Sequence, residues 1–128
     1  MGSWGPDTFQ NDNAQDFMVG VTDKLAKTCR RMLNKKHVAP KSKRGGIGRQ
    51  FYYDEARAAA ITLSTLFKAG APVSVEDLDD AQKVIAVMLD DQEWIGQWRT
   101  PATIKRSLES DLANVRWALH RAKANLPK

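Results

Sequence analysis

The side chains that most often carry out catalysis are sparse in this sequence. It contains one cysteine, Cys29, and two histidines, His37 and His120, which lie far apart along the chain. A cysteine or histidine becomes a nucleophile or general base only beside a group that activates it. Cys29 falls on an apolar stripe, where a free cysteine usually packs as a small hydrophobe, and no Cys/His zinc site can be assembled from these residues. We therefore expect a protein that is not an enzyme and that has no metal or cofactor.

A second source of chemistry is a cluster of acidic residues. Residues 76–93 contain seven acids and a single lysine. They lack the ligand spacing and the central glycine of a calcium loop, so a solvated acidic face is the favoured interpretation. Two tryptophans lie beside these acids, and charge combined with aromatic side chains is the mixture that a tight interface with a basic protein uses. The residues predicted to form a partner-binding face are Glu76, Asp79, Asp80, Asp91, Glu93 and Trp98.

The basic residues are concentrated in a different part of the chain. Residues 24–53 contain ten lysines and arginines and no acid, although the net charge of the whole chain is only +5. The Gly-rich part, 43–49, has amides and cations that suit a phosphate, but it lacks the spacing of a P-loop. A flexible linker is the alternative interpretation. The aromatic residues 51–53 are candidate stacking rings, although core positions are more common for such residues. The anion-binding candidates are Lys41, Lys43, Arg44 and Arg49.

Segments with helical periodicity must position these residues. Apolar side chains recur every three or four positions over four stretches, at about 13–35, 55–69, 75–90 and 101–124, and no segment alternates like a strand for long. The sequence therefore predicts an all-α single domain, 1–128, built as a bundle of four main helices with short extra turns at 91–99 and a mobile loop at 37–50. The expected helix-end residues are Asn13 or Asn11, Asp54, Ser74 and Thr100 as N-caps, with Pro101 in a first turn and Gly70 as a C-terminal stop.

Three local features of these stretches give further expectations. Gly20 lies inside the first stretch, where a glycine is unfavourable, so we expect another element to pack closely against it. The alanine run at 58–60 also implies close packing against a neighbour. Trp117 lies next to the apolar stripe of the last stretch, and we expect it in the core rather than at a surface groove.

The N-terminal residues carry a more specific pattern. Residues 1–17 read Met-Gly-Ser-Trp-Gly-Pro-Asp-Thr-Phe-Gln-Asn-Asp-Asn-Ala-Gln-Asp-Phe. This opening resembles that of an uncharacterised bacterial family whose members begin Met-Gly-x-Trp-Gly, continue through Phe-x-Asn-Asp-x-Ala and then give an acid and an aromatic. The basic segment at 35–50 departs from that pattern. The resemblance implies a small helical bacterial protein and brings no settled activity with it.

These observations lead to a functional hypothesis. No apolar run is long enough to span a membrane and no secretory signal is evident, so a cytoplasmic protein is expected. Small helical bacterial proteins without catalytic residues often act by occluding another protein. The leading prediction is an immunity protein that binds and occludes a bacterial toxin domain through the acidic face. The alternative is a nucleic-acid-binding module that uses residues 24–49. The sequence leaves the identity of the toxin and the oligomeric state open.

Overall fold

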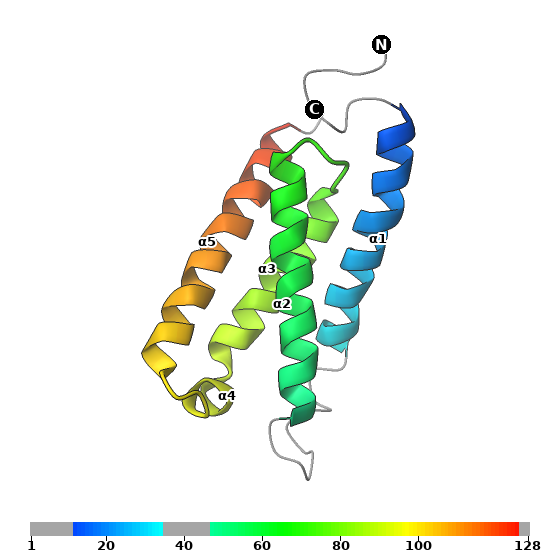
Figure 1. Cartoon of the computed structure of the whole chain (residues 1–128). Coiled ribbons are helices and arrows are strands. Elements are labelled where there is room, and N and C mark those ends of the chain that lie inside the picture. The colour runs from blue at the N-terminus through cyan, green and yellow to red at the C-terminus, as the bar shows by residue number, and fades with distance from the viewer. Residues whose placement is uncertain (1–11, 35–46, 126–128) are drawn as a thin grey trace.

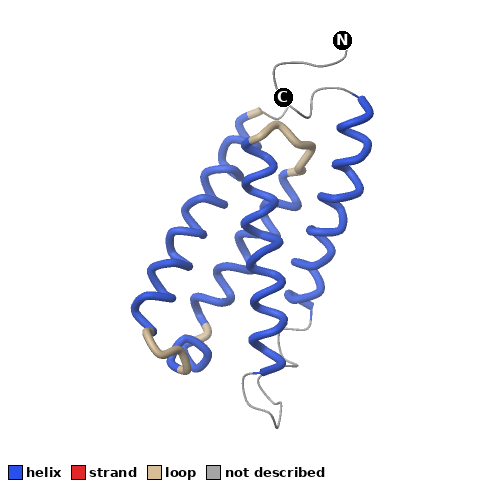
Figure 2. Tube along the Cα trace, viewed as in Figure 1, coloured by secondary structure: helices blue, strands red, loops and turns tan. Residues whose placement is uncertain are grey.

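Helices form all the regular secondary structure of the residues that the computed structural model describes, 12–34 and 47–125 (Figures 1 and 2). The predicted all-α bundle of four main helices with a short extra turn is therefore confirmed. The short extra turn is helix α4, which lies between α3 and α5. The helices are α1 (Asp12–Asn34), α2 (Ile47–Lys68), α3 (Val75–Asp90), α4 (Gln92–Gly96) and α5 (Pro101–Ala124).

Helices α2 and α3 form the centre of the bundle. Each of the outer helices, α1 and α5, contacts both of them, and α1 and α5 lie on opposite flanks (Figure 1). The apolar stripes of all four long helices meet in one core, whose fully buried side chains include Leu63, Leu78, Ile85, Met88 and Leu108. The outward surfaces of α1 and α5 consequently face different sides of the molecule.

The first two helices begin earlier than the sequence predicts. Helix α1 begins at Asp12, so Asn13 lies inside its first turn and is not the N-cap, while Asn11 falls outside the described residues. Helix α2 begins at Ile47, so the predicted loop is wrong for residues 47–50, and residues 37–46 lie outside the described residues. Asp54 is an exposed residue within α2 and not a cap. The glycine at 48 costs only about 1 kcal/mol in a helix, and the buried stripe that begins at Tyr53 outweighs that cost.

The connection between α2 and α3 contains the helix stop and the helix cap that the sequence predicts. Gly70 has φ 96°, a backbone conformation that favours glycine, and the amide of Ala71 donates to the carbonyl of Leu66 at 2.9 Å, as in a Schellman motif. Ser74 then accepts from the amide of Asp77 at 3.1 Å and caps α3. Both the predicted stop and the predicted cap are confirmed.

The other local expectations have different outcomes. The predicted close packing of the alanine run is confirmed for Ala59 and Ala60, which are almost inaccessible to solvent, while Ala58 is exposed. Thr100 occupies the N-cap position of α5 before Pro101, although its side chain makes no capping hydrogen bond. The expectation at Gly20 is wrong, because a Cβ placed there would meet nothing within 4 Å. Gly20 lies on the exposed side of α1, so no neighbouring element requires it.

Candidate binding surfaces

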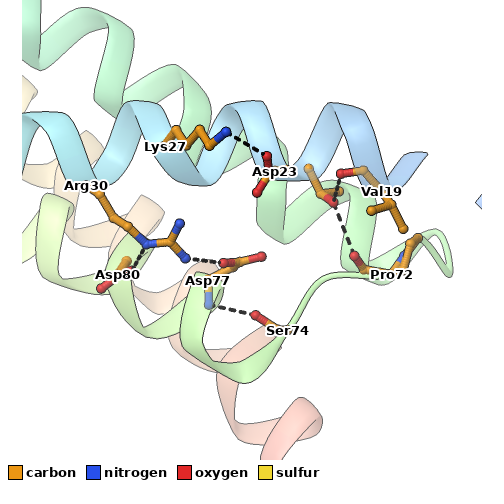
Figure 3. A network of polar contacts seen from close by, with 9 residues as sticks. Val19, Asp23, Lys27, Arg30, Pro72, Ser74, Asp77 and Asp80 are labelled. Atoms are coloured by element: carbon orange, nitrogen blue, oxygen red, sulfur yellow. Dashed lines mark hydrogen bonds and ion pairs between the residues drawn. The ribbon is translucent and has the colours of Figure 1, made fainter. Parts of the chain in front are cut away.

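Two acids of α3 are used to hold α1 in place. The guanidinium of Arg30 donates to Asp77 Oδ1 at 2.7 Å and to Asp80 Oδ2 at 3.0 Å (Figure 3). Burial opposes the charge of Arg30, but the hydrogen bonds and charges of the two acids outweigh it and raise the pKa of the guanidinium. The Asp77 and Asp80 side chains are only 16% and 22% exposed. Asp80, predicted to bind a partner, therefore joins α1 to α3.

A second contact fixes the other half of α1. The buried Thr22 hydroxyl lies within hydrogen-bond distance of the carbonyl of Pro72, at 3.3 Å, and of Val19, at 3.2 Å (Figure 3). Pro72 belongs to the connection between α2 and α3. Together with the Arg30 contacts, this bond sets the rotation of α1 about its own axis and so decides which of its residues face solvent.

Asp79 and Glu76 remain accessible at the N-terminal half of α3. Asp79 accepts from the amide of Gln82 at 2.8 Å and pairs with Lys83 at 3.1 Å. The hydrogen bonds from Gln82 and Lys83 lower the pKa of Asp79, and the charge of Lys123 on α5 adds to the effect. Glu76 is exposed and lines a groove of about 570 Å³ at the end of the bundle, with Phe67, Val73, Ser74, Val75, Ala122 and Asn125.

Asp91 lies at the opposite end of α3 and belongs to an aromatic cluster. It accepts from the hydroxyl of Tyr53 at 2.7 Å and from the amide of Trp94 at 3.0 Å, which makes it the N-cap of α4. The rings of Tyr53 and Trp94 meet edge to face at 4.8 Å. Since α3 has 16 residues and is about 24 Å long, Asp91 and Glu93 are separated from Glu76 by nearly its whole length. The six predicted residues do not form one continuous face.

Trp98 packs against the core instead of standing out from the surface. Its ring contacts that of Trp94 at 5.7 Å, and Trp94 is only 1% exposed. The indole Nε1 of Trp98 is buried and has no hydrogen-bond partner among the described residues. A buried unpaired donor reduces stability, so this ring is held by packing. As an exposed anchor for a partner, Trp98 is poorly placed.

The environment of Cys29 agrees with its interpretation as a small hydrophobe. Its side chain is fully buried between α1 and α2, and Sγ lies 4.0 Å from the carbonyl oxygen of Ala56. Burial, with a further contribution from the charges of Asp80 and Asp77, raises the pKa of the thiol to about 12. The sulfur therefore stays protonated near neutral pH, and only a thiolate is an effective nucleophile.

The predicted anion-binding residues cannot be placed as a group. Lys41, Lys43 and Arg44 lie outside the described residues. Arg49 is in the first turn of α2, but its side chain is not among those described. Of the aromatic residues that follow, Tyr53 is buried in the core, which is the more common position for such residues.

A tryptophan outside the predicted binding residues stands on the described surface. Trp117 on α5 is 50% exposed, and the prediction that it lies in the core is wrong. Lys68 Nζ from α2 lies 5.0 Å from the centre of its ring, and Arg121 Cζ lies 5.4 Å from it. The helical spacing contains the signal: Val115 and Leu119 are buried, and position 117 points away from both. We call Trp117, Lys68 and Arg121 the Trp117 surface.

A polar contact joins α2 to α5 further along the same side of the bundle. Arg57 Nε pairs with Asp111 Oδ2 at 2.7 Å, and Arg57 Nη2 donates to Ser107 Oγ at 2.6 Å. A groove of about 470 Å³ is lined there by Asp54, Arg57, Ala58, Ile61, Thr62 and Asp111. Because its only arginine is held by a carboxylate and a hydroxyl, this groove offers little free charge to a ligand.

Within residues 12–34 and 47–125, no group of three or more His, Cys, Asp and Glu side chains could hold a metal ion. None of the described helices combines the length and the apolar character needed to cross a bilayer.

Comparison with known proteins assigns the chain to no family. No family model matches it, no curated protein matches it significantly, and no solved structure does so either. The resemblance of residues 1–17 to an uncharacterised bacterial family therefore stays a prediction. Most of that motif also lies outside the described residues.

Proposed function

We propose that this chain is a non-enzymatic protein-binding protein that acts as an immunity protein by occluding a bacterial toxin. The observation that supports the proposal is Trp117. The core is closed by other side chains, yet this large ring stays half exposed between a lysine and an arginine. Tryptophan and arginine are enriched among the few residues that contribute most of the energy of protein interfaces.

Helix α5 gives this ring a rigid support. It is a continuous helix of 24 residues, about 36 Å long, anchored by buried side chains on both sides of Trp117, among them Val115, Ala118 and Leu119. A side chain on such a support loses little conformational freedom when a partner binds, which favours affinity. A long and rigid helical face also suits occlusion, since it can cover an active site without rearranging.

The acidic residues have a smaller part in this proposal than the sequence suggested. Asp80 and Asp91 serve the fold, through Arg30 and Tyr53 respectively. Glu76 and Asp79 remain accessible to a basic partner. Reversing Asp79 and Asp80 together would break the contact between α1 and α3, so a test of the acidic residues should change Glu76 and Asp79 only.

Protection of cells tests the proposed function. If the gene next to the one for this chain encodes a toxin domain, co-expression should restore growth with the wild-type chain and not with Trp117→Ala. Phe17→Ala is a matched control, because Phe17 is also an exposed aromatic but lies on α1, on the opposite flank. Failure of the wild-type chain to protect against any toxin encoded beside it, or to bind that toxin, would overturn the proposal.

A nucleic-acid-binding role for residues 24–49 is the second candidate. Its support in the structure is the exposure of Lys24, Lys27 and Arg31 on α1. Lys27, however, already pairs with Asp23 at 3.1 Å. This role predicts an affinity for DNA or RNA that falls steeply with salt, with a log-log slope of about −0.9 or −0.7 for each phosphate contacted. An affinity that is absent or insensitive to salt would exclude it.

A further inference from the structure

We infer that the Trp117 surface is the docking surface of this chain and that it takes a protein partner with an acidic patch around an apolar pocket. In such a complex the indole enters the pocket while Lys68 and Arg121 pair with carboxylates beside it. This inference rests on the proposed function and adds the site and the chemistry of the partner.

The first argument is the absence of acids from the two stretches of chain that carry the ring and its cations. Neither residues 56–75 of α2 and the following connection nor residues 112–125 of α5 contain an aspartate or glutamate. The C-terminal halves of α2 and α5 lie at the same end of the bundle (Figure 1). The cations in these two stretches are Arg57, Lys68, Arg116, Arg121 and Lys123.

The second argument compares the partners of Lys68 and Arg121 with those of cations in other parts of the chain. Arg30, Arg57 and Lys83 each contact a carboxylate of the same chain. Lys68 and Arg121 have no carboxylate partner among the described residues and lie against the indole ring instead. Their charge is therefore available to a partner. Complementary charge of this kind raises the rate at which two proteins meet and helps to set their orientation.

The geometry of the ring favours a protein over a nucleic acid. A base stacks on an aromatic face, and here two cations already lie over the ring, so a stacking base would compete with them for it. A carboxylate can approach Lys68 or Arg121 from the solvent side while the cation stays where it is. The cation–π contacts strengthen when water is removed from them, so closure of an apolar pocket around the indole would reinforce the arrangement.

Nuclear magnetic resonance of the intact chain tests the chemistry of the partner directly. The indole N–H signal of Trp117 is identified by its loss in Trp117→Phe. The probes are a glutamate-rich peptide that contains leucines and a single-stranded oligothymidylate of equal charge. We expect the peptide to shift the Trp117 signal more strongly than the oligothymidylate does, and to lose this effect as salt is added. A shift with the oligothymidylate alone, or with neither probe, would overturn the inference.

Paired variants then separate the surface from the function. Lys68→Gln/Arg121→Gln should lower the association rate with the co-expressed toxin by about tenfold at low salt. Trp117→Ala should raise the dissociation rate by about thirtyfold. Lys24→Gln/Lys105→Gln removes the same charge from exposed positions elsewhere and should change neither rate. Thermal unfolding of each variant shows that the fold is intact.

The two proposals fail in different ways. If the wild-type chain protects cells and the Lys68/Arg121 and Trp117 variants protect equally well, the docking surface is wrong while the immunity function stands. If the wild-type chain neither protects nor binds, the function is wrong. The peptide and oligothymidylate titration still decides what the Trp117 surface recognises in that case.

Discussion

The buried thiol of Cys29 makes the stability of the fold depend on pH in a defined direction. Its pKa is raised from 9.0 to about 12 in the folded chain. Above pH 9 the unfolded chain releases this proton and the folded chain keeps it, so the unfolded state binds fewer protons and stability falls as pH rises. The loss is about 1.4 kcal/mol per pH unit in this range, and it reaches about 2 kcal/mol between neutral pH and about pH 10.5.

Urea unfolding of the wild-type chain and of Cys29→Ala at a series of pH values measures this contribution. Lysines and tyrosines titrate in both proteins, so the difference between the two curves isolates the thiol. We expect Cys29→Ala to be less stable at neutral pH, because a fully buried side chain is shortened, and to lose less stability as pH rises. A thiol reagent at pH 8 should label Cys29 only after urea is added. Parallel stability curves, or rapid labelling of the folded chain, would refute the reasoning.

Three further stability predictions follow from individual sites. Gly20→Ala should stabilise the chain by about 0.5 to 1 kcal/mol, because a Cβ there meets no other atom within 4 Å. Gly70→Ala should destabilise it by about 1 kcal/mol or more, because Gly70 has a positive φ. Urea unfolding of the two variants measures both changes in the free energy of unfolding. Leu108→Ala should cost about 2 to 5 kcal/mol as a fully buried leucine, and a smaller loss by calorimetry would place it outside the core. Asp80→Ala should lower the free energy of unfolding by about 1 kcal/mol, because it removes a contact with α1. Glu76→Ala should change it by less than about 0.5 kcal/mol, because Glu76 is exposed. Equal effects of the two substitutions would contradict the different positions of the two acids.

The bounds of α3 and α5 could be predicted from the sequence because their signals are local. Ser74 caps α3 through its own hydroxyl, and Pro101 begins α5 with the backbone angle that a helix needs. The beginning of α2 could not be found in this way. Its first turns contain Gly48 and polar residues, and the buried positions that are described in α2 lie further along the helix, from Tyr53 on.

The candidate site was harder to predict than the fold. Helical spacing shows that an acid lies on the surface of its helix, but not which neighbouring helix it faces. Asp77 and Asp80 are 47 and 50 residues from their partner Arg30, so nothing in the local sequence of α3 indicates the contact. Trp117 is the opposite case, because its position off the apolar stripe was visible in the sequence. Helical spacing is a better guide to the exposure of this residue than the general tendency of tryptophan to be buried.

The distribution of charge along the chain differs from its distribution in space. The basic segment 24–53 and the acidic segment 76–93 are separate in sequence. Folding places α1 against α3, so that Arg30 of the basic segment meets Asp77 and Asp80 of the acidic one. Both segments therefore use part of their charge in the contact between α1 and α3. Lys68 and Arg121 lie outside both segments, carry no such partner among the described residues, and keep their charge beside an exposed ring. A surface available to a partner is thus better identified by the charges that remain after packing than by the longest run of like charges in the sequence.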